Sequence, residues 1–144
     1  LKSDDGSMIA LAFVFSILIP SGYGFGRSQS ITAKGQLICP SKPNLAANVQ
    51  IRMIDRDTFS RNDYMGETRS DAQGRFQLSG QMRELSNVDA ELLIWTDCGD
   101  GWTPGKRRLR VQIPDSYINQ GQFDLGVFNL EATHGSSESR DIIY

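Results

Sequence analysis

ETRSDAQGRFQL, residues 67–78, is the stretch that decides the fold. Asp71 favours the opening position of a type I turn, and Gly74 suits the left-handed backbone conformation that ends such a turn. After the turn, residues 75–78 alternate polar and apolar side chains, as expected of a half-buried strand. The stretch therefore predicts a β-hairpin, with strands at 67–70 and 75–78.

Alternating apolar residues extend this pattern along the rest of the chain. Gly126 interrupts one such run and indicates a bulge or a close backbone approach. A length of 144 residues with 39% hydrophobic content fits one domain. We therefore predict an all-β sandwich of about seven strands. The segments that fit strands are 30–39, 49–53, 67–70, 75–78, 92–98, 109–113 and 123–127.

The N-terminal region has the pattern of a secretory signal peptide. An apolar run from Ile9 to Ile19 precedes Pro20 and small residues, and it is shorter than the roughly 20 residues of a membrane-spanning helix. We expect cleavage after Gly24, with Gly26 as the alternative, and we regard the residues before Met8 as additional to the peptide.

These features divide the chain into three expected parts. Residues 1–24 are the signal peptide, 25–131 the β-sandwich domain, and 132–144 a polar C-terminal tail, which we expect to be disordered. The processed protein is predicted to be secreted, with no transmembrane span.

Two cysteines, Cys39 and Cys98, remain after the expected cleavage. In an exported protein they most simply form one disulfide, and two buried free thiols are the alternative. A metal site is not expected, because no short-range ligand pair accompanies the cysteines and His134. Acidic residues cluster near the loop after residue 53, where interleaved arginines favour a solvated loop over a calcium site; they are Asp55, Asp57, Asp63 and Glu67.

Composition also limits the functional class. A net charge of −2 and a pI near 5.3 make nucleic acid an unexpected partner. The single histidine, His134, lies in the polar tail, so no serine or cysteine nucleophile has an evident base. We expect neither enzymatic activity nor a cofactor.

A basic strand and a tryptophan form the candidate partner-binding site. Alternation places Lys106, Arg108 and Arg110 on the face opposite Leu109, and Trp102 lies in the preceding glycine-containing loop. An exposed aromatic side chain beside cations suits an anionic membrane surface or a protein partner. The alternative is a solvated strand face with a packed Trp102.

A set of motifs, in order and spacing, resembles the nematode transthyretin-like family. They lie at 35–39, 71–80, 83–85, 97–98, 113–118 and 123–131. The resemblance implies a transthyretin-type, immunoglobulin-like sandwich that is secreted. It also implies an interaction module that bridges anionic lipid or cell-surface receptors; the alternative is a carrier of a small hydrophobic ligand.

The related hydroxyisourate hydrolases differ from this chain at the residues that matter for catalysis. They need several histidines and a Tyr-Arg-Gly-Ser C-terminus, whereas this chain has one histidine and ends in RDIIY. The hydrolase activity is therefore not expected here.

Overall fold

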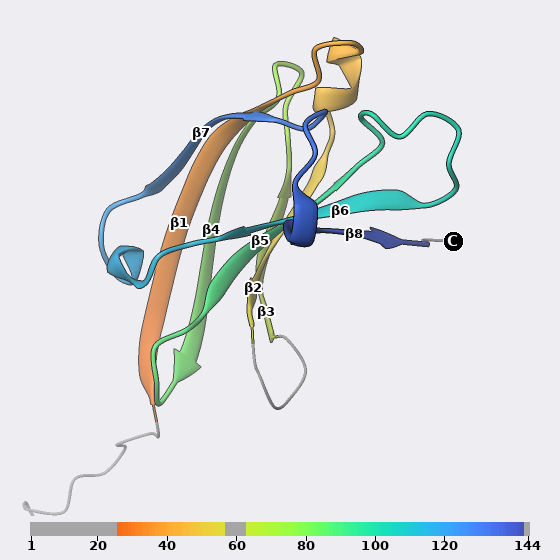
Figure 1. The fold of residues 1–144 in the computed structure, drawn as a ribbon. Helices are drawn as coiled ribbons and strands as arrows, with labels where there is room; N and C mark the ends of the chain where they lie inside the picture. The colour runs from red at the N-terminus through yellow and green to blue at the C-terminus, as the bar shows by residue number, and fades with distance from the viewer. Residues whose placement is uncertain (1–25, 57–62, 143–144) are drawn as a thin grey trace, which may run out of the picture.

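A computed structural model describes residues 26–56 and 63–142, which form two β-sheets (Figure 1). The predicted signal peptide, residues 1–24, lies outside the described residues. None of the helices in the described part is long and apolar enough to cross a membrane. The strands are β1 (Arg27–Ile38), β2 (Gln50–Asp55), β3 (Asp63–Arg69), β4 (Arg75–Glu84), β5 (Ala90–Thr96), β6 (Lys106–Gln112), β7 (Phe123–Asn129) and β8 (Glu138–Asp141). Short 3-10 helices are Pro43–Ala46, Asp115–Tyr117 and Gly135–Ser137.

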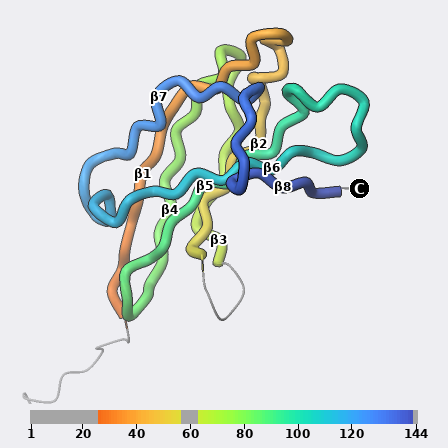
Figure 2. Tube along the Cα trace, viewed as in Figure 1, coloured from red at the N-terminus to blue at the C-terminus, as the bar shows by residue number. Residues whose placement is uncertain are grey.

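The two sheets pack face to face around one main core. One sheet has the order β4-β1-β7, and the other has the order β3-β2-β5-β6-β8 (Figure 2). All pairs are antiparallel except β1 with β7. Alternate residues of β1, β2, β5 and β6 fill the space between the sheets, among them Ile31, Ile51, Leu92 and Leu109. The predicted all-β sandwich is confirmed, with eight strands in the described residues.

The turn at residues 71–74 is confirmed, but the predicted hairpin is wrong. Asp71 Oδ1 accepts the amides of Gln73 and Arg75 at 2.9 and 2.8 Å, and Gly74 has a φ of +78°. However, β3 pairs with β2 while β4 pairs with β1, so the turn carries the chain from one sheet to the other. β3 and β4 nevertheless approach closely within the strands, since a Cβ on Gly66 would lie 2.7 Å from the Ser79 carbonyl oxygen.

The bulge expected at Gly126 is present in β7. Lys34 is opposite Asp124 while Gln36 is opposite Val127, so β7 has one residue more than β1 across this interval. Gly126 has a φ of +72°, and its amide donates to Asp124 Oδ1 at 2.8 Å. The glycine therefore permits a left-handed residue that lets β7 follow the twist of β1.

The C-terminal segment differs from the disordered tail that we expected. Residues 138–141 form β8, which pairs antiparallel with β6 at the edge of the larger sheet. The sequence there, ESRD, lacks the apolar alternation of a half-buried strand. Ion pairs hold this strand instead, as described below.

Candidate functional site

Trp102 lies at the tip of the loop between β5 and β6 and is completely exposed. Its relative accessibility is 101%. The loop projects from the sandwich on the same side as the C-terminal end of the described chain (Figures 1 and 2). Of the two arrangements left open by the sequence, the structure thus has the exposed tryptophan. A large apolar ring held in water is a feature of surfaces that bind partners.

Contacts with β8 anchor the Trp102 loop to the body of the protein. The Arg140 guanidinium pairs with the buried Asp100 carboxylate and donates to the Pro104 carbonyl oxygen at 3.0 Å. The hydrogen bond to Asp100 raises the pKa of Arg140. At the base of the loop, a Cβ on Gly105 would lie 2.6 Å from the Asp141 carbonyl oxygen. The loop is therefore fixed at its middle and at its base, which lowers the entropy that Trp102 would lose on binding.

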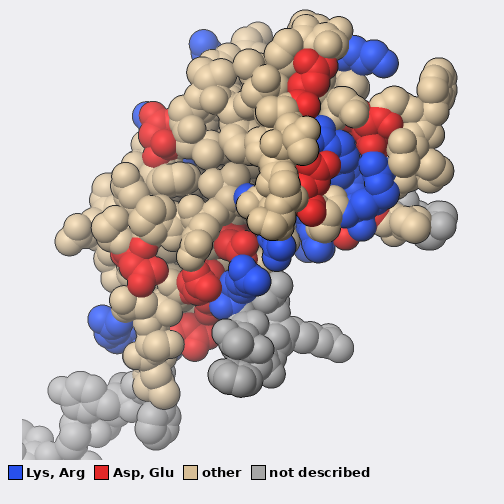
Figure 3. Space-filling view, viewed as in Figure 1, with Lys and Arg blue, Asp and Glu red and all other residues tan. Residues whose placement is uncertain are grey.

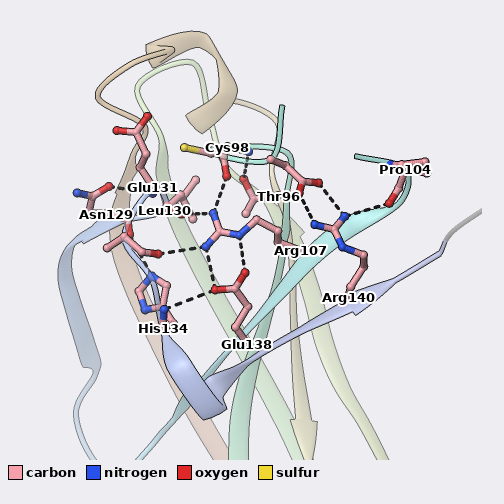
Figure 4. A network of polar contacts seen from close by, with 12 residues as sticks. Thr96, Cys98, Pro104, Arg107, Asn129, Leu130, Glu131, His134, Glu138 and Arg140 are labelled. Carbon is pink, nitrogen blue, oxygen red and sulfur yellow. Dashed lines mark hydrogen bonds and ion pairs between the residues drawn. The ribbon is translucent and has the colours of Figure 1, made fainter. Parts of the chain in front are cut away.

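Arg107 joins the C-terminal segment to β6 from inside the sandwich (Figure 4). Its buried guanidinium forms a bidentate pair with Glu138 at 2.6 and 3.0 Å, and this hydrogen bonding lowers the pKa of the Glu138 carboxyl group. The same group donates to the carbonyl oxygens of Cys98, Leu130 and Ala132. Arg107 was not among the residues predicted from the sequence to form a site. The strand alternation could have indicated it, because Arg107 is two residues from Leu109 and therefore lies on the same inner face of the strand.

The basic strand has the predicted alternation, with Lys106, Arg108 and Arg110 on the outer face of the larger sheet. Lys106 Nζ lies 3.1 Å from Asp97 Oδ2, and both side chains are about half exposed. Arg108 donates to Asp141 Oδ2 at 3.1 Å. Figure 3 shows basic and acidic side chains interleaved over β6 and β8. The cations therefore share a face, but they are partly neutralised by neighbouring carboxylates.

We use the name docking corner for Trp102, Lys106 and Ile142. Lys106 begins β6 at the base of the Trp102 loop, and the backbone of Ile142 lies beside Gly105. Ile142 is 61% exposed and adds a second apolar side chain that the sequence analysis assigned to a disordered tail. Arg108 and Arg110 lie farther along β6, so the structure spreads the four predicted site residues from the loop tip along the strand.

The Cys39–Cys98 disulfide is present, with an S–S distance of 2.04 Å. Both cysteines are buried, and neither is free. The bond ties the residue that follows β1, in one sheet, to the second residue after β5, in the other sheet. This covalent link holds the base of the Trp102 loop on the core.

The single histidine, His134, is packed against β7, although the sequence placed it in a polar tail that we expected to be disordered. The His134 ring stacks on Phe128 with 4.7 Å between centroids, and Nε2 lies 3.1 Å from the Asn129 carbonyl oxygen. No nucleophile is among these contacts. His134 thus supports the turn that leads into β8.

Three carboxylates, those of Asp55, Asp63 and Glu84, gather with their oxygens within 4.8 Å of one another. Asp55 already accepts the Asp89 amide at 2.8 Å. Glu67, which the sequence analysis considered with them, instead pairs with Arg52 at 3.3 Å, and Asp57 lies outside the described residues. We assign no function to this cluster.

An apolar groove of about 380 Å³ lies beside the disulfide at one end of the sandwich. Its walls come from the end of β1, the 3-10 helix after it and the turn at residues 71–74. The lining residues are Leu37, Ile38, Cys39, Pro40, Pro43, Ala46, Ala72 and Gln73.

Comparison with known proteins agrees with this architecture. Residues 34–114 match the model of the transthyretin-like family. Transthyretin-like protein 5 of Caenorhabditis elegans is 35% identical over 134 residues, covering 88% of this chain and 94% of that protein. The chain belongs to the transthyretin-like family.

Other members of the transthyretin-like family match over similar lengths. Transthyretin-like protein 33 of C. elegans is 34% identical over 95% of this chain and 99% of that protein. Among solved structures, a 9R-lipoxygenase from Cyanothece aligns with a TM-score of 0.48 and 19% identity over 88% of this chain and 20% of that chain. The family assignment therefore rests on the sequence matches.

Proposed function

We propose that this transthyretin-like protein is an extracellular interaction module that docks on anionic lipid surfaces through its docking corner. Its role in this proposal is binding, with no catalytic step and no cofactor. The observation that carries the proposal is the complete exposure of Trp102 on an anchored loop.

The chemistry of the corner suits the boundary between lipid headgroups and acyl chains. Indole rings prefer this boundary because one edge is polar and the remainder apolar. Ile142 is the second exposed apolar side chain of the corner. Lys106 is nearly half exposed, and its ion pair with Asp97 is of the exposed kind that contributes little, so its ammonium group is available to phosphate or carboxylate groups.

Flotation with vesicles tests this function. The disulfide-bonded protein is mixed with vesicles of phosphatidylcholine alone or with phosphatidylserine, at low and physiological salt. We expect flotation only with the anionic vesicles, and we expect salt to weaken it because exposed charges are screened.

The W102A variant should lose most of this flotation without a change in the unfolding midpoint, since the exposed ring buries no area in the fold. R75Q on β4, which removes an exposed cation from the other sheet, is the control. Equal flotation of W102A and the unaltered protein would refute the proposal.

Transport of a small hydrophobic ligand is a second candidate, supported by the apolar groove beside the disulfide. Gln73 offers a single side-chain amide among mostly apolar walls, a composition typical of sites for apolar ligands. Native mass spectrometry of the purified protein would test it. A co-purifying apolar molecule that is lost from A72W, which places a large ring at an exposed position of the groove lining, would support this function. A ligand-free protein unable to bind an apolar fluorescent probe would contradict it.

A further inference from the structure

The outer face of the larger sheet carries an array of arginines that the docking corner does not use. The register places Arg52, Leu93 and Arg110 in one row across the sheet, on β2, β5 and β6. The next row contains Arg69, Gln50, Trp95 and Arg108, on β3, β2, β5 and β6. We call Arg52, Arg69, Arg108 and Arg110 the arginine face.

The dimensions of this array follow from strand geometry. Adjacent strands are about 4.8 Å apart and alternate residues along a strand about 7 Å apart. The arginines thus extend over about 14 Å across the sheet in two rows about 7 Å apart. The array lies on a single sheet face, with Leu93 and Trp95 buried beneath it, and it follows the twist of that sheet.

The charges of this face differ from those of the whole chain. Its strands contribute five cations, the four arginines and Lys106, against three anions, Glu67, Glu91 and Asp141, a net charge of +2. The full chain has a net charge of −2. The face is therefore a positive region on a protein that is negative overall. The outer face of the smaller sheet is positive as well, with Lys34, Arg75 and Arg83 against Asp124. The arginine face differs from it in its four guanidinium groups, not in its net charge.

The four guanidinium groups have different local partners. Arg108 pairs with Asp141 at 3.1 Å. Arg52 pairs with Glu67 at 3.3 Å and lies over the Trp95 and Tyr64 rings, at 5.3 and 5.8 Å from their centroids. Arg69 and Arg110 donate only to the backbone carbonyls of Asn48 and Ser136, among the hydrogen bonds of the described residues. Neither of these two arginines forms an ion pair among the described residues, although Arg69 is near enough to Glu67 to help lower the pKa of that carboxyl group. Both guanidinium groups therefore keep donors free for an incoming anion.

We propose that the arginine face binds a sulfated glycosaminoglycan. Guanidinium groups form bidentate hydrogen bonds with oxyanions, and clusters of basic residues are a recurrent feature of heparin-binding patches. A flexible linear chain with sulfates at regular intervals can contact several arginines of this array at once.

The face suits a polysaccharide better than a lipid surface. The aromatic ring at its centre, Trp95, is only 6% exposed, and Leu93 beside it is 8% exposed. Membrane docking needs apolar groups that can leave water, and these lie at the docking corner instead. Tyr64, 60% exposed at the edge of the face, offers a ring on which a sugar can stack.

The affinity for heparin tests this proposal directly. It is measured with the disulfide-bonded protein at physiological salt, for heparin oligosaccharides and for their desulfated forms. R52Q/R69Q removes two arginines that lie outside the docking corner and its strand. We expect its affinity for heparin to fall about tenfold or more, because each charge-assisted hydrogen bond contributes on that scale. R75Q/R83Q removes the same charge from exposed positions of β4 in the other sheet and should bind heparin like the unaltered protein. If R52Q/R69Q is unfolded, R69Q alone, at an exposed edge position, serves with R83Q as its control.

The possible results separate this proposal from the proposed function. W102A should keep heparin binding and lose vesicle flotation, whereas R52Q/R69Q should do the opposite. Equal weakening of the two double variants, or equal binding of desulfated chains, would overturn the proposal. So would a loss of vesicle binding in R52Q/R69Q with heparin binding intact, because the face would then serve the lipid surface.

Discussion

The two tryptophans of the chain occupy opposite environments. Trp95 is 6% exposed, and its indole nitrogen donates to Asp141 Oδ2 at 2.9 Å. Trp102 is fully exposed and has no such role in the fold. Burial of an aromatic ring contributes several kcal/mol to stability, so Trp95 is explained by the fold. Trp102 requires an explanation outside the folded chain, and docking supplies one.

Arg107 should be the charged residue on which the fold depends most. R107M would leave the Glu138 carboxylate and the carbonyl oxygens of Cys98 and Leu130 without their donor, at a cost of about 3–5 kcal/mol. The neighbouring R108M removes a partly exposed ion pair and should cost about 1 kcal/mol or less. Urea unfolding of the two variants gives the comparison; equal losses would contradict this account of the network.

Glu138 should make the stability of the protein sensitive to acid. Its hydrogen bonds to Arg107 lower its pKa in the folded state below the ordinary value of 4.5. The resulting stability is complete above the unfolded pKa and is lost as the pH falls through the folded pKa. We therefore expect the difference in unfolding free energy between the unaltered protein and E138Q to be largest near pH 7 and to shrink below about pH 4.5. A difference that is constant from pH 7 to pH 3 would exclude this linkage.

At the scale of elements, the turn at residues 71–74 depends on its glycine. Gly74 has a φ of +78°, and a Cβ there would lie 2.1 Å from the Leu37 carbonyl oxygen. The left-handed conformation alone costs an alanine about 1–2 kcal/mol. G74A should destabilise the protein by clearly more than this, because of the added close contact. Gly121 has a φ of +57° with nothing within 4 Å of its Cβ position, so G121A isolates the backbone cost. Thermal unfolding of both variants tests this; equal shifts would mean that the close approach to β1 is easily relaxed.

The same turn illustrates how far local sequence signals extend. Asp71 and Gly74 were sufficient to predict the turn, because both act within four residues. They could not decide whether the flanking strands pair with each other. The pairing of β4 is decided by β1, which is distant in sequence. Ten residue pairs between β1 and β4 place β4 in the smaller sheet.

The C-terminal strand shows a second limit of sequence reasoning. β8 lacks an apolar alternation, so its polar sequence resembled a disordered tail. Its position is fixed by Arg107 with Glu138 and by Arg140 with Asp100, pairs that are separated by 31 and 40 residues. Predicting such contacts requires the fold itself, which is why the position of Ile142 and the anchor of the Trp102 loop were not predicted.

At the scale of the whole molecule, two surfaces of different chemistry adjoin one another. The docking corner offers exposed apolar groups with a lysine, and the arginine face offers an array of four guanidinium groups. Both lie on the larger sheet and its β5–β6 loop, whereas the outer face of the smaller sheet combines neutral polar residues such as Thr32 and Ser79 with the cations Arg75 and Arg83. If both proposals hold, the protein would bind a lipid surface and a polysaccharide through adjacent sites.

The central claim, docking through Trp102, is tested most directly by tryptophan fluorescence. The chain has two tryptophans, of which only Trp102 is exposed, so its emission alone can shift when the ring leaves water. On addition of vesicles that contain phosphatidylserine, we predict a blue shift and protection from acrylamide quenching, both absent in W102F. An unchanged spectrum for vesicle-bound protein would contradict the claim, because Trp102 would then remain in water while another surface made the contact.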